Sequence, residues 1–320
     1  MRRIVVARTA AEILCLRSRW EYLQARCSRT IFQSFKWNWL AAQLFDHEEP
    51  HVIVCETENG MSILPLCINL WRKSLSCLGD VLFDYRDTLS IGDEEALHAA
   101  WEEASRIKLP FSTGGLQSSS HKRWTGFHLN SFYRAPMVKA AEISAESFAE
   151  RHSRSASRLR RLERMGVALR EHIPASPSLL RWVYQQKAIQ PPEAGENVFA
   201  DPRRIEFMAA VAEHDPHEQE VFALEIAGKC IAALVTLREY RCRRFYTIWF
   251  DQQWARYSPG ISLIYEVTRR SLAEGLTCDY MTGEQDYKMR FATSVEPLYW
   301  IEASAEELRA LAERREIAAA

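Results

Sequence analysis

The stretch that decides the fold runs from Phe245 to Lys288. It begins with the apolar strand FYTIWF (245–250), passes through the tight turn SPG (258–260) into an amphipathic helix, and ends in a second strand followed by GEQDYK (283–288). This order of strand, loop and helix brings unpaired backbone N–H groups and the positive end of the helix dipole to one point. The stretch therefore predicts a phosphate-binding loop, with a polar cluster at the end of the second strand.

The composition is that of an ordinary globular chain. Of its 320 residues 47% are hydrophobic and 26% are charged, enough for a sizeable core divided between two domains. A formal net charge of -1 gives no general reason to expect binding to nucleic acid or acidic membranes, so any polyanion site would be local. The basic start of the chain lacks an apolar signal segment, and no later stretch reaches about 18 apolar residues. We therefore expect a cytoplasmic protein.

The cysteines give no sign of a disulfide framework or a metal site. They are scattered without a C-x-x-C pair, and most of them sit in apolar runs, which is typical of reduced core residues. We therefore expect no metal. The eight are Cys15, Cys27, Cys55, Cys67, Cys77, Cys230, Cys242 and Cys278.

The first half has the pattern of an α/β unit. Helical patterns at 10–25 and 35–45 follow a short strand, and two further strands flank Asn59-Gly60, a pair typical of a tight hairpin. Pro65 inside the second of these strands (61–69) indicates an edge strand or a bulge. A loop with the sequence DYRD (84–87) precedes a predicted helix at 94–108, and glycines at 114, 115 and 126 indicate further turns.

An arginine-rich helix separates the halves. It lies between about 144 and 166 and ends at Gly166 as a C-cap, so we predict an N-terminal domain at 1–143 and a C-terminal domain at 144–320. Arginines 151, 154, 158 and 161 follow helical spacing and form one positive stripe. Two interpretations stay open: a solvated helix face, or a guide for an anionic substrate or cofactor phosphates, in which Arg158 would contact the substrate.

The second half continues with a strand, two helices and three successive strands. The three strands are predicted at 220–226, 231–239 and 243–250, after helices at 177–189 and 202–214. The turn SPG then leads into a helix that ends at Gly275, and a strand, the GEQDYK segment, a strand near 297–301 and a terminal helix follow. The fold class is therefore α/β in the broad sense, with mixed helices and strands (α+β).

This order is that of the GNAT acyltransferase fold. The second half resembles the BioF-like/CelD-type branch of that superfamily, a group associated with cellulose and exopolysaccharide synthesis. The residues that carry the likeness are RLERMG (161–166), GKCIAA (228–233), YSPG (257–260) and the segment 279–288.

The first half supports the same resemblance. Its segments FQS (32–34), ILPL (63–66) and DYRD (84–87), with Trp37 and Trp39, are similar to the N-terminal half of these proteins. A more distant similarity links the chain to FemABX-type aminoacyl transferases, which carry two GNAT-like domains. The resemblance implies two tandem GNAT-like domains here, each a mixed, mostly antiparallel sheet flanked by helices.

The resemblance also implies acetyl-CoA or another acyl-CoA as the donor. The strand at 243–250 would separate from its neighbour and accept the pantetheine arm, and 256–262 would hold the pyrophosphate. Gly260 would let the backbone approach closely, and Ser262 could cap the helix or donate to phosphate. The segment differs from the family pattern in one respect. The usual GNAT loop carries two small residues, whereas RYSPGIS (256–262) has one glycine and a proline that lacks an N–H. The expected cofactor-binding residues are Thr247, Trp249, Arg256, Tyr257, Ser258, Gly260, Ile261 and Ser262.

Acyl transfer needs a base for the acceptor proton and an acid for the leaving thiolate. Glu284, Asp286 and Asp251 are the candidate bases, Tyr287 is the candidate acid, and Lys288 could position an anionic acceptor. An ordinary structural interpretation is equally open: Asp279, Glu284 and Lys288 would form surface ion pairs, Tyr287 would pack as a half-buried aromatic, and Asp251 would cap a loop. Asp84 and Arg86 are expected on the acceptor side of the site, unless their segment is a salt-bridged surface loop.

Three functions therefore stay open. The first is an acyl-CoA-dependent N- or O-acyltransferase acting by direct transfer on a saccharide precursor or a small amine or sugar. The second is a FemABX-like aminoacyl transferase that uses aminoacyl-tRNA, and only this one requires nucleic acid. The third is a non-catalytic GNAT-fold component of a polysaccharide-synthesis assembly.

Overall fold

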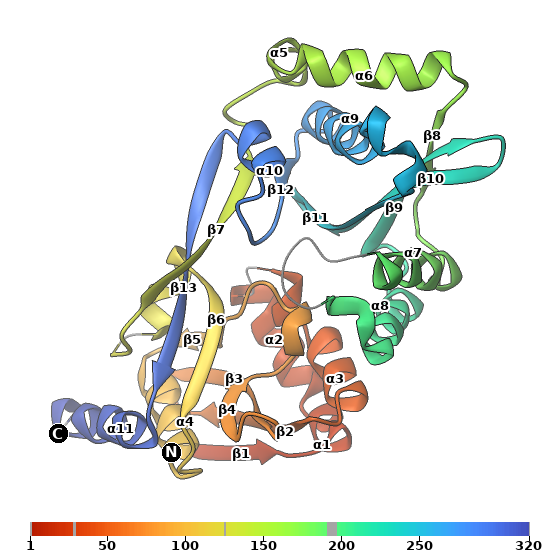
Figure 1. Ribbon diagram of the computed structural model, residues 1–320. Coiled ribbons are helices and arrows are strands. Elements are labelled where there is room, and N and C mark those ends of the chain that lie inside the picture. The colour runs from red at the N-terminus through yellow and green to blue at the C-terminus, as the bar shows by residue number, and fades with distance from the viewer. Residues whose placement is uncertain (1, 28–29, 125, 191–196, 320) are drawn as a thin grey trace. The chain divides into compact units, whose positions relative to one another are not determined.

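The computed structural model describes residues 2–27, 30–124, 126–190 and 197–319 (Figure 1). Their contacts divide the chain into two compact units. Unit 1 comprises Met1–Tyr133 and Pro297–Ala320, and unit 2 comprises Arg134–Glu296. The predicted loop PPEAG (191–195) lies outside the described residues.

Unit 1 contains a mixed sheet with helices on both faces. Its strand order is β1-β2-β3-β4-β6-β13, with β5 paired to β3, and all the pairs given are antiparallel except β4 with β6. The elements are β1 (Arg3–Ala7), α1 (Ala10–Cys15), α2 (Arg17–Cys27), α3 (Phe35–Leu44), β2 (Glu48–Glu56), β3 (Gly60–Asn69), β4 (Ser74–Cys77), β5 (Leu89–Gly92), α4 (Glu95–Ser105), β6 (Phe111–Gln117), part of β13 (Ser294–Ala303) and α11 (Ala305–Ala319).

The two faces of this sheet follow from the alternation of side chains along β2. Val52 and Val54 pack in the cluster that holds α1, α2 and Phe35. Ile53 and Cys55 point the other way, into the cluster around α4. Because successive residues of a strand face opposite sides, this apolar run serves two cores at once.

Unit 2 repeats this plan. Its strand order is β7-β12-β11-β10-β9-β8, antiparallel except for the parallel pair of β11 and β12. The elements are β7 (Asn130–Val138), α5 (Ala145–Arg151), α6 (Ser153–Arg164), β8 (Ala168–His172), α7 (Pro177–Ile189), α8 (Pro202–His214), β9 (Gln219–Ile226), β10 (Lys229–Glu239), β11 (Cys242–Phe250), a 3-10 segment (Gln252–Tyr257), α9 (Pro259–Ala273), β12 (Thr277–Asp279) and α10 (Asp286–Phe291).

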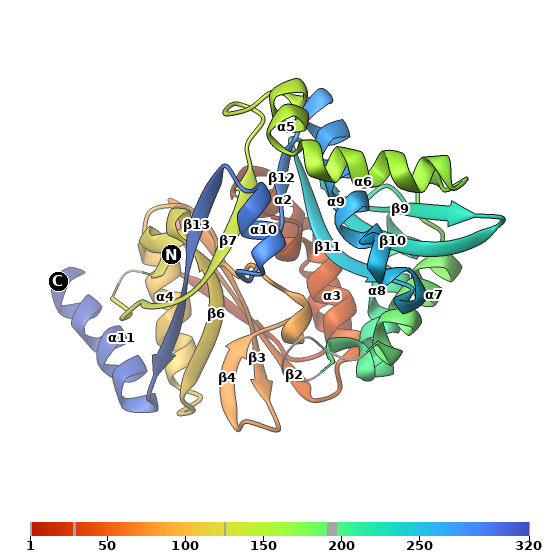
Figure 2. The same cartoon turned by 45° about the horizontal axis from the view of Figure 1, so that its top comes forward.

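Helices also cover both faces of the unit 2 sheet. Figure 1 shows α9 on one face and α7 with α8 on the other, and Figure 2 shows α6 lying along α9. The core on the α9 face includes Phe222 and Leu224 of β9 and Leu263 and Val267 of α9. This arrangement confirms the predicted fold class, a mixed α/β fold with largely antiparallel strands flanked by helices.

The two halves of the sequence exchange their last strands. Each half runs through a strand, helices, a group of strands (β2 to β5 in the first half, β9 to β11 in the second), a helix and two further strands, which α10 separates in the second half. The last strand of the first half, β7, pairs through Val138 and Met137 with β12 of unit 2. The last strand of the second half, β13, pairs with β6 of unit 1. The contact division therefore differs from the predicted boundary at 143/144, because β7 and β13 each run from one unit into the other.

Several predicted details were wrong for local reasons. The helix expected at 10–25 breaks at Leu16, and the one expected at 144–166 breaks at His152. Pro65 lies neither on an edge strand nor at a bulge, because β3 has partners on both sides. It sits in the gap where the pairing with β5 ends at Ile63 and the pairing with β4 begins at Leu66, so its missing N–H breaks no ladder.

The cysteines are less uniformly buried than their apolar neighbours suggested. Cys55, Cys67, Cys77 and Cys278 are buried, whereas Cys15 is exposed on α1. Across the described residues, helices both long and apolar enough to cross a membrane are absent.

The predicted turn at Gly114-Gly115 is instead part of β6. Gly115 has a φ of +75°, and a Cβ added there would lie 2.1 Å from the carbonyl oxygen of Asp84. This glycine therefore lets the 84–87 loop lie against the strand, where the Arg86 N–H donates to the Gly115 carbonyl at 3.2 Å.

We expect Gly115→Ala to destabilise the protein by more than the usual cost of a left-handed alanine, which is about 1–2 kcal/mol. Gly275→Ala is the matched control, since Gly275 has a φ of +74° and nothing within 4 Å of an added Cβ. Thermal unfolding of both variants measures the difference. Equal losses would show that the close approach to Asp84 costs nothing.

Candidate active site

The geometry of the site starts where β11 leaves β12. In the described part of the chain, β11 pairs with β12 only at Cys242, Arg243 and Arg244, whereas it pairs with β10 along its whole length. The register with β10 shifts at Tyr246, which marks a bulge in β11. The pairing with β12 therefore ends at Arg244 and Asp279, while β11 continues beside β10 to Phe250.

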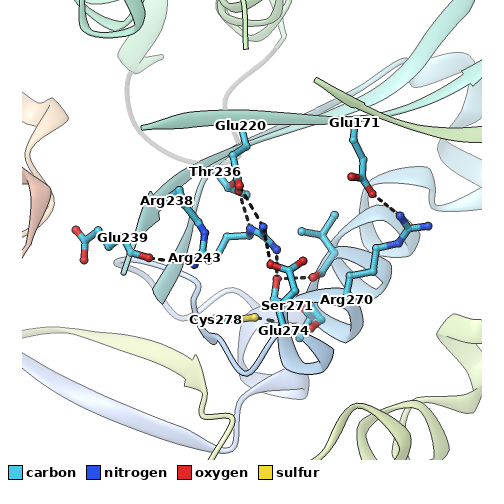
Figure 3. Close-up of polar contacts among 12 residues, drawn as sticks. Glu171, Glu220, Thr236, Arg238, Glu239, Arg243, Arg270, Ser271, Glu274 and Cys278 are labelled. Carbon is cyan, nitrogen blue, oxygen red and sulfur yellow. Dashed lines mark hydrogen bonds and ion pairs between the residues drawn. The ribbon is translucent and has the colours of Figure 1, made fainter. Parts of the chain in front are cut away.

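A buried ion network fixes the point of separation. Arg243 is 2% exposed and donates to Glu220 of β9 at 2.7 Å, to the Ser271 hydroxyl at 2.7 Å and to Glu274 at 3.3 Å (Figure 3). The Thr236 hydroxyl donates to the same Glu220 carboxylate at 2.9 Å. One arginine thus ties β9 and β11 to α9.

Arg244 does the same on the opposite face. It donates to Glu239 of β10 at 2.8 Å and forms a close ion pair with Asp279 of β12. Asp279 is fully buried, and its other oxygen accepts the Met281 N–H at 2.8 Å. The prediction that Asp279 could belong to a surface ion pair was therefore wrong.

The turn between β11 and α9 brings the backbone N–H groups at the start of α9 close to the end of β11. Ser258 adopts a left-handed conformation with φ 53°, and Pro259 is the first residue of α9. The N–H groups of the first helical turn have no carbonyl partner within the helix. Pro259 has no N–H to lose there, so the proline costs this helix end little.

The predicted loop residues divide between packing and surface. Gly260 is buried, and a Cβ added there would lie 3.3 Å from the Phe250 ring, so this glycine serves the close packing of α9 on β11. The Ser262 hydroxyl donates to the Ser258 carbonyl at 3.1 Å, and Ile261 packs against the core. Thr247 and Trp249 are buried in the part of β11 beyond the separation.

Two arginines meet at Tyr257, beside the start of α9. The guanidinium of Arg256 lies 4.7 Å from the centre of the Tyr257 ring, and that of Arg161 from α6 lies 4.9 Å from it. Arg158 and Arg154 are exposed on the same helix. The arginine stripe thus reaches the turn before α9, and both interpretations of it stay open.

Two of the candidate bases hold their charge through a cationic partner. Glu284 is exposed and forms a bidentate pair with Arg134, and the hydrogen bond from Arg134 lowers the pKa of this carboxyl. Asp251 accepts from Lys229 at 2.8 Å and caps the following segment at the Gln253 N–H. Both contacts lower its pKa, the Lys229 contact first. Lowered pKa values favour the charged carboxylate and weaken it as a base.

The other residues of the GEQDYK segment have mixed surroundings. Asp286 is exposed at the first position of α10, and Tyr287 is half-buried against the core of unit 2. Lys288 is 8% exposed and donates to the Thr282 carbonyl at 2.6 Å. The lysine was expected at the surface in the structural interpretation, and burial contradicts that part of it.

Asp84 and Arg86 lie in unit 1, in a loop held by the FQS segment. The Gln33 amide donates to the Tyr85 carbonyl at 3.0 Å, and Asp87 is buried in a bidentate pair with Arg123. The neighbouring motifs thus stabilise one another. The acceptor role of Asp84 and Arg86 stays a prediction.

Sequence reasoning missed one further carboxyl. Burial raises the pKa of Glu296, and the negative charge of Asp279 raises it further. A raised pKa near the point where β11 leaves β12 is a property expected of a general base. Glu296 stands in β13 with no motif around it, so the sequence offered no signal for it. Sequence reasoning also missed Arg243 and Arg244, although two adjacent arginines in an otherwise apolar strand could have pointed to them. Within the described ranges, groups of three or more histidine, cysteine or carboxylate residues able to hold a metal ion are absent.

Comparison with known proteins supports the fold. Residues 149–289 match the family described as "Acetyltransferase (GNAT) domain". Curated proteins with a significant match to this chain were not found. The second half of the chain therefore contains a GNAT-fold acetyltransferase domain, and the presence of this domain makes the chain an enzyme.

Solved structures match nearly the whole chain. The C-terminal domain (DUF2156) of a candidate lysylphosphatidylglycerol synthetase from Agrobacterium fabrum is 14% identical, with 96% of this chain and 97% of that chain covered and a TM-score of 0.61. FemX is 9% identical, with 97% and 99% covered and a TM-score of 0.58. A tandem GNAT protein from the clavulanic acid biosynthesis pathway is 9% identical, with 94% and 98% covered and a TM-score of 0.51. These likenesses establish a shared fold.

We expect Arg243→Met to lower the free energy of unfolding by about 3–5 kcal/mol, because Glu220 would keep a buried, unpaired charge. Replacing both partners, Glu220→Met with Arg243→Met, should recover most of the loss. Arg181→Met is the surface control: its partners Glu206 and Glu213 have side chains that are 52% and 48% exposed, and we expect a change within about 1 kcal/mol. Chemical denaturation measures all three. A double variant no more stable than the single one would contradict the prediction.

Proposed function

We propose that the chain is an acyl-CoA-dependent N- or O-acyltransferase that transfers an acetyl or longer acyl group directly to an acceptor. The observation that carries the proposal is the separation of β11 from β12: their pairing ends at Arg244 and Asp279, while β11 continues along β10 to Phe250. An extended chain of amides, such as the pantetheine arm, can take the place of the missing strand. Bound acyl-CoA would supply an activated thioester.

The phosphate end of the donor belongs at the start of α9. There the free N–H groups of the first turn and the helix dipole favour an anion. Arg256 and Arg161 both contact the ring of Tyr257 at this turn and add two positive charges. Ser258, Gly260, Ile261 and Ser262 shape the turn, and the two arginines compensate for the donor N–H that Pro259 lacks.

The catalytic groups belong at the other end of the segment 245–250 of β11. Tyr287 returns a proton to the departing sulfur, and a carboxylate takes the proton of the acceptor. Glu296 suits that task better than Glu284 and Asp251, because burial raises its pKa whereas cationic partners lower the pKa of the other two. Asp286 remains a candidate by its place in the GEQDYK segment. Lys288, Asp84, Arg86 and Arg158 are assigned to the acceptor.

The acceptor class follows the CelD-type resemblance. We assign the chain to that branch, with a small amine or sugar or a polysaccharide precursor as acceptor and a cytoplasmic site of action. The sequence segments 161–166, 228–233 and 257–260 support this assignment.

We expect acetyl-CoA or a longer acyl-CoA to bind to the wild-type protein, and Arg161→Ala with Arg256→Ala to weaken that binding roughly tenfold or more, since charged hydrogen bonds contribute about 1.5–3 kcal/mol each. Isothermal titration calorimetry measures the affinity. The phosphate-free analogue acetyl-pantetheine should bind equally to both proteins.

Arg164→Ala is the matched control, because Arg164 is an exposed arginine of the same helix. It should leave acyl-CoA binding unchanged. Absence of binding by any acyl-CoA, or an equal effect of the control, would rule out the donor site described here.

A second function is favoured by the exposed arginines of α6. A FemABX-like aminoacyl transferase would use Arg154, Arg158 and Arg161 to contact the phosphates of a charged tRNA. The matching fold of FemX is compatible with this function.

If tRNA is the donor, its binding should weaken steeply with salt, and the log–log slope should flatten by about 2–3 when Arg154, Arg158 and Arg161 are changed to Ala. Filter binding across a salt series measures the slope. Changing Arg17, Arg106 and Arg309, which are exposed arginines of other helices, is the control of equal charge. Equal slopes for the two triple variants would exclude α6 as the tRNA contact.

A further inference from the structure

Unit 2 contains a pocket of about 730 Å³ whose lining includes Trp249 and Asp251, two residues that the sequence had placed at the transfer site. It lies between α7, the turn that joins β9 to β10, and the end of β11. Its volume falls in the range of about 300–1,000 Å³ typical of small-molecule sites.

This pocket is on the opposite face of β11 from the phosphate turn. Ile248 and Phe250 are the residues nearest to Gly260 of α9. Trp249 lies between them in the strand and therefore faces the other side, toward α7. Along β11 the pocket is about 16 Å from Arg244, at about 3.3 Å per residue, so it is distinct from the point where β11 leaves β12.

Two tryptophans give the pocket its apolar walls. Trp182 of α7 and Trp249 of β11 pack edge to face, with ring centres 5.2 Å apart and planes at 77°. Trp249 is 8% exposed and belongs to the core, whereas Trp182 is partly accessible. Their perpendicular planes form an aromatic corner, which fits the flat apolar face of a ring.

The polar part of the lining is neutral in sum. Lys229 and Asp251 form an ion pair at 2.8 Å and cancel each other's charge. Gln186 and Gln252 add side-chain amides, each able to donate and to accept hydrogen bonds. The pocket therefore offers no excess charge to bind a charged ligand. It does offer hydrogen-bond donors and acceptors for the hydroxyl groups of a neutral one.

We propose that this pocket binds the pyranose ring of a neutral sugar. Such a ring has an apolar face for the tryptophan corner and hydroxyl groups for the two amides and the Lys229–Asp251 pair. The assignment does not require acyl-CoA to be the donor, and it concerns a site separate from the transfer centre.

Saturation-transfer NMR with N-acetylglucosamine, glucose and cellobiose tests the proposal, with adenosine and octanoate as probes of other chemistry. We expect a saturation signal from at least one sugar and none from adenosine or octanoate. Trp182→Ala should weaken sugar binding roughly five- to tenfold, and Gln186→Ala should weaken it as well.

Gln185→Ala is the matched control, because Gln185 is the exposed neighbour of Gln186 on α7 and does not line the pocket. It should bind sugar as the wild type does. Trp182→Phe, which keeps an aromatic face, should bind more tightly than Trp182→Ala, so that loss of the ring is separated from loss of the fold. Absence of binding by all three sugars, binding of adenosine or octanoate in their place, or sugar binding unchanged in both Trp182→Ala and Gln186→Ala would overturn the proposal.

Discussion

Two consecutive arginines at the start of β11 are the constraint on which unit 2 depends. Arg243 and Arg244 point to opposite faces of the sheet, and each is neutralised by carboxylates from different elements. A buried guanidinium without a partner would be strongly unfavourable, so β9, β10, β12 and α9 are held in one arrangement around this point. Beyond this point the pairing of β11 with β12 ends, so the ion network lies where the two strands separate.

The same constraint explains why the glycine of the SPG turn serves packing. With β11 fixed, α9 lies close enough that a Cβ at Gly260 would press on Phe250. The left-handed turn is made instead at Ser258. The second glycine that is usual in this loop is therefore not needed for the turn. Pro259 leaves the start of α9 with one backbone N–H fewer, and the positive charges of Arg161 and Arg256 lie beside it.

Local pattern was enough to predict the strands and helices of unit 2, since β9, β10, β11, α7 and α8 all lie within two residues of their predicted bounds. Partners distant in sequence were not predictable. Glu284 pairs with Arg134, and Asp279 pairs with Arg244, and neither spacing follows a helix or strand period. The sequence could therefore nominate Glu284 as a base but could not show that an arginine holds its charge. For the same reason the sequence predicted an edge strand or a bulge at Pro65, because the gap between β4 and β5 depends on two strands that come later in the chain.

The exchange of β7 and β13 gives the chain a temporal order of folding. Leu298 of β13 pairs with Gln117 of β6, roughly 180 residues earlier, so this side of unit 1 has no partner until nearly the whole chain has been synthesised. During translation β6 presents an unpaired edge to the cell, the kind of edge that invites pairing with other chains. In a tandem protein built this way each half needs a strand from the other to complete its sheet. The first half therefore stays incomplete during synthesis until β13 of the second half has been made.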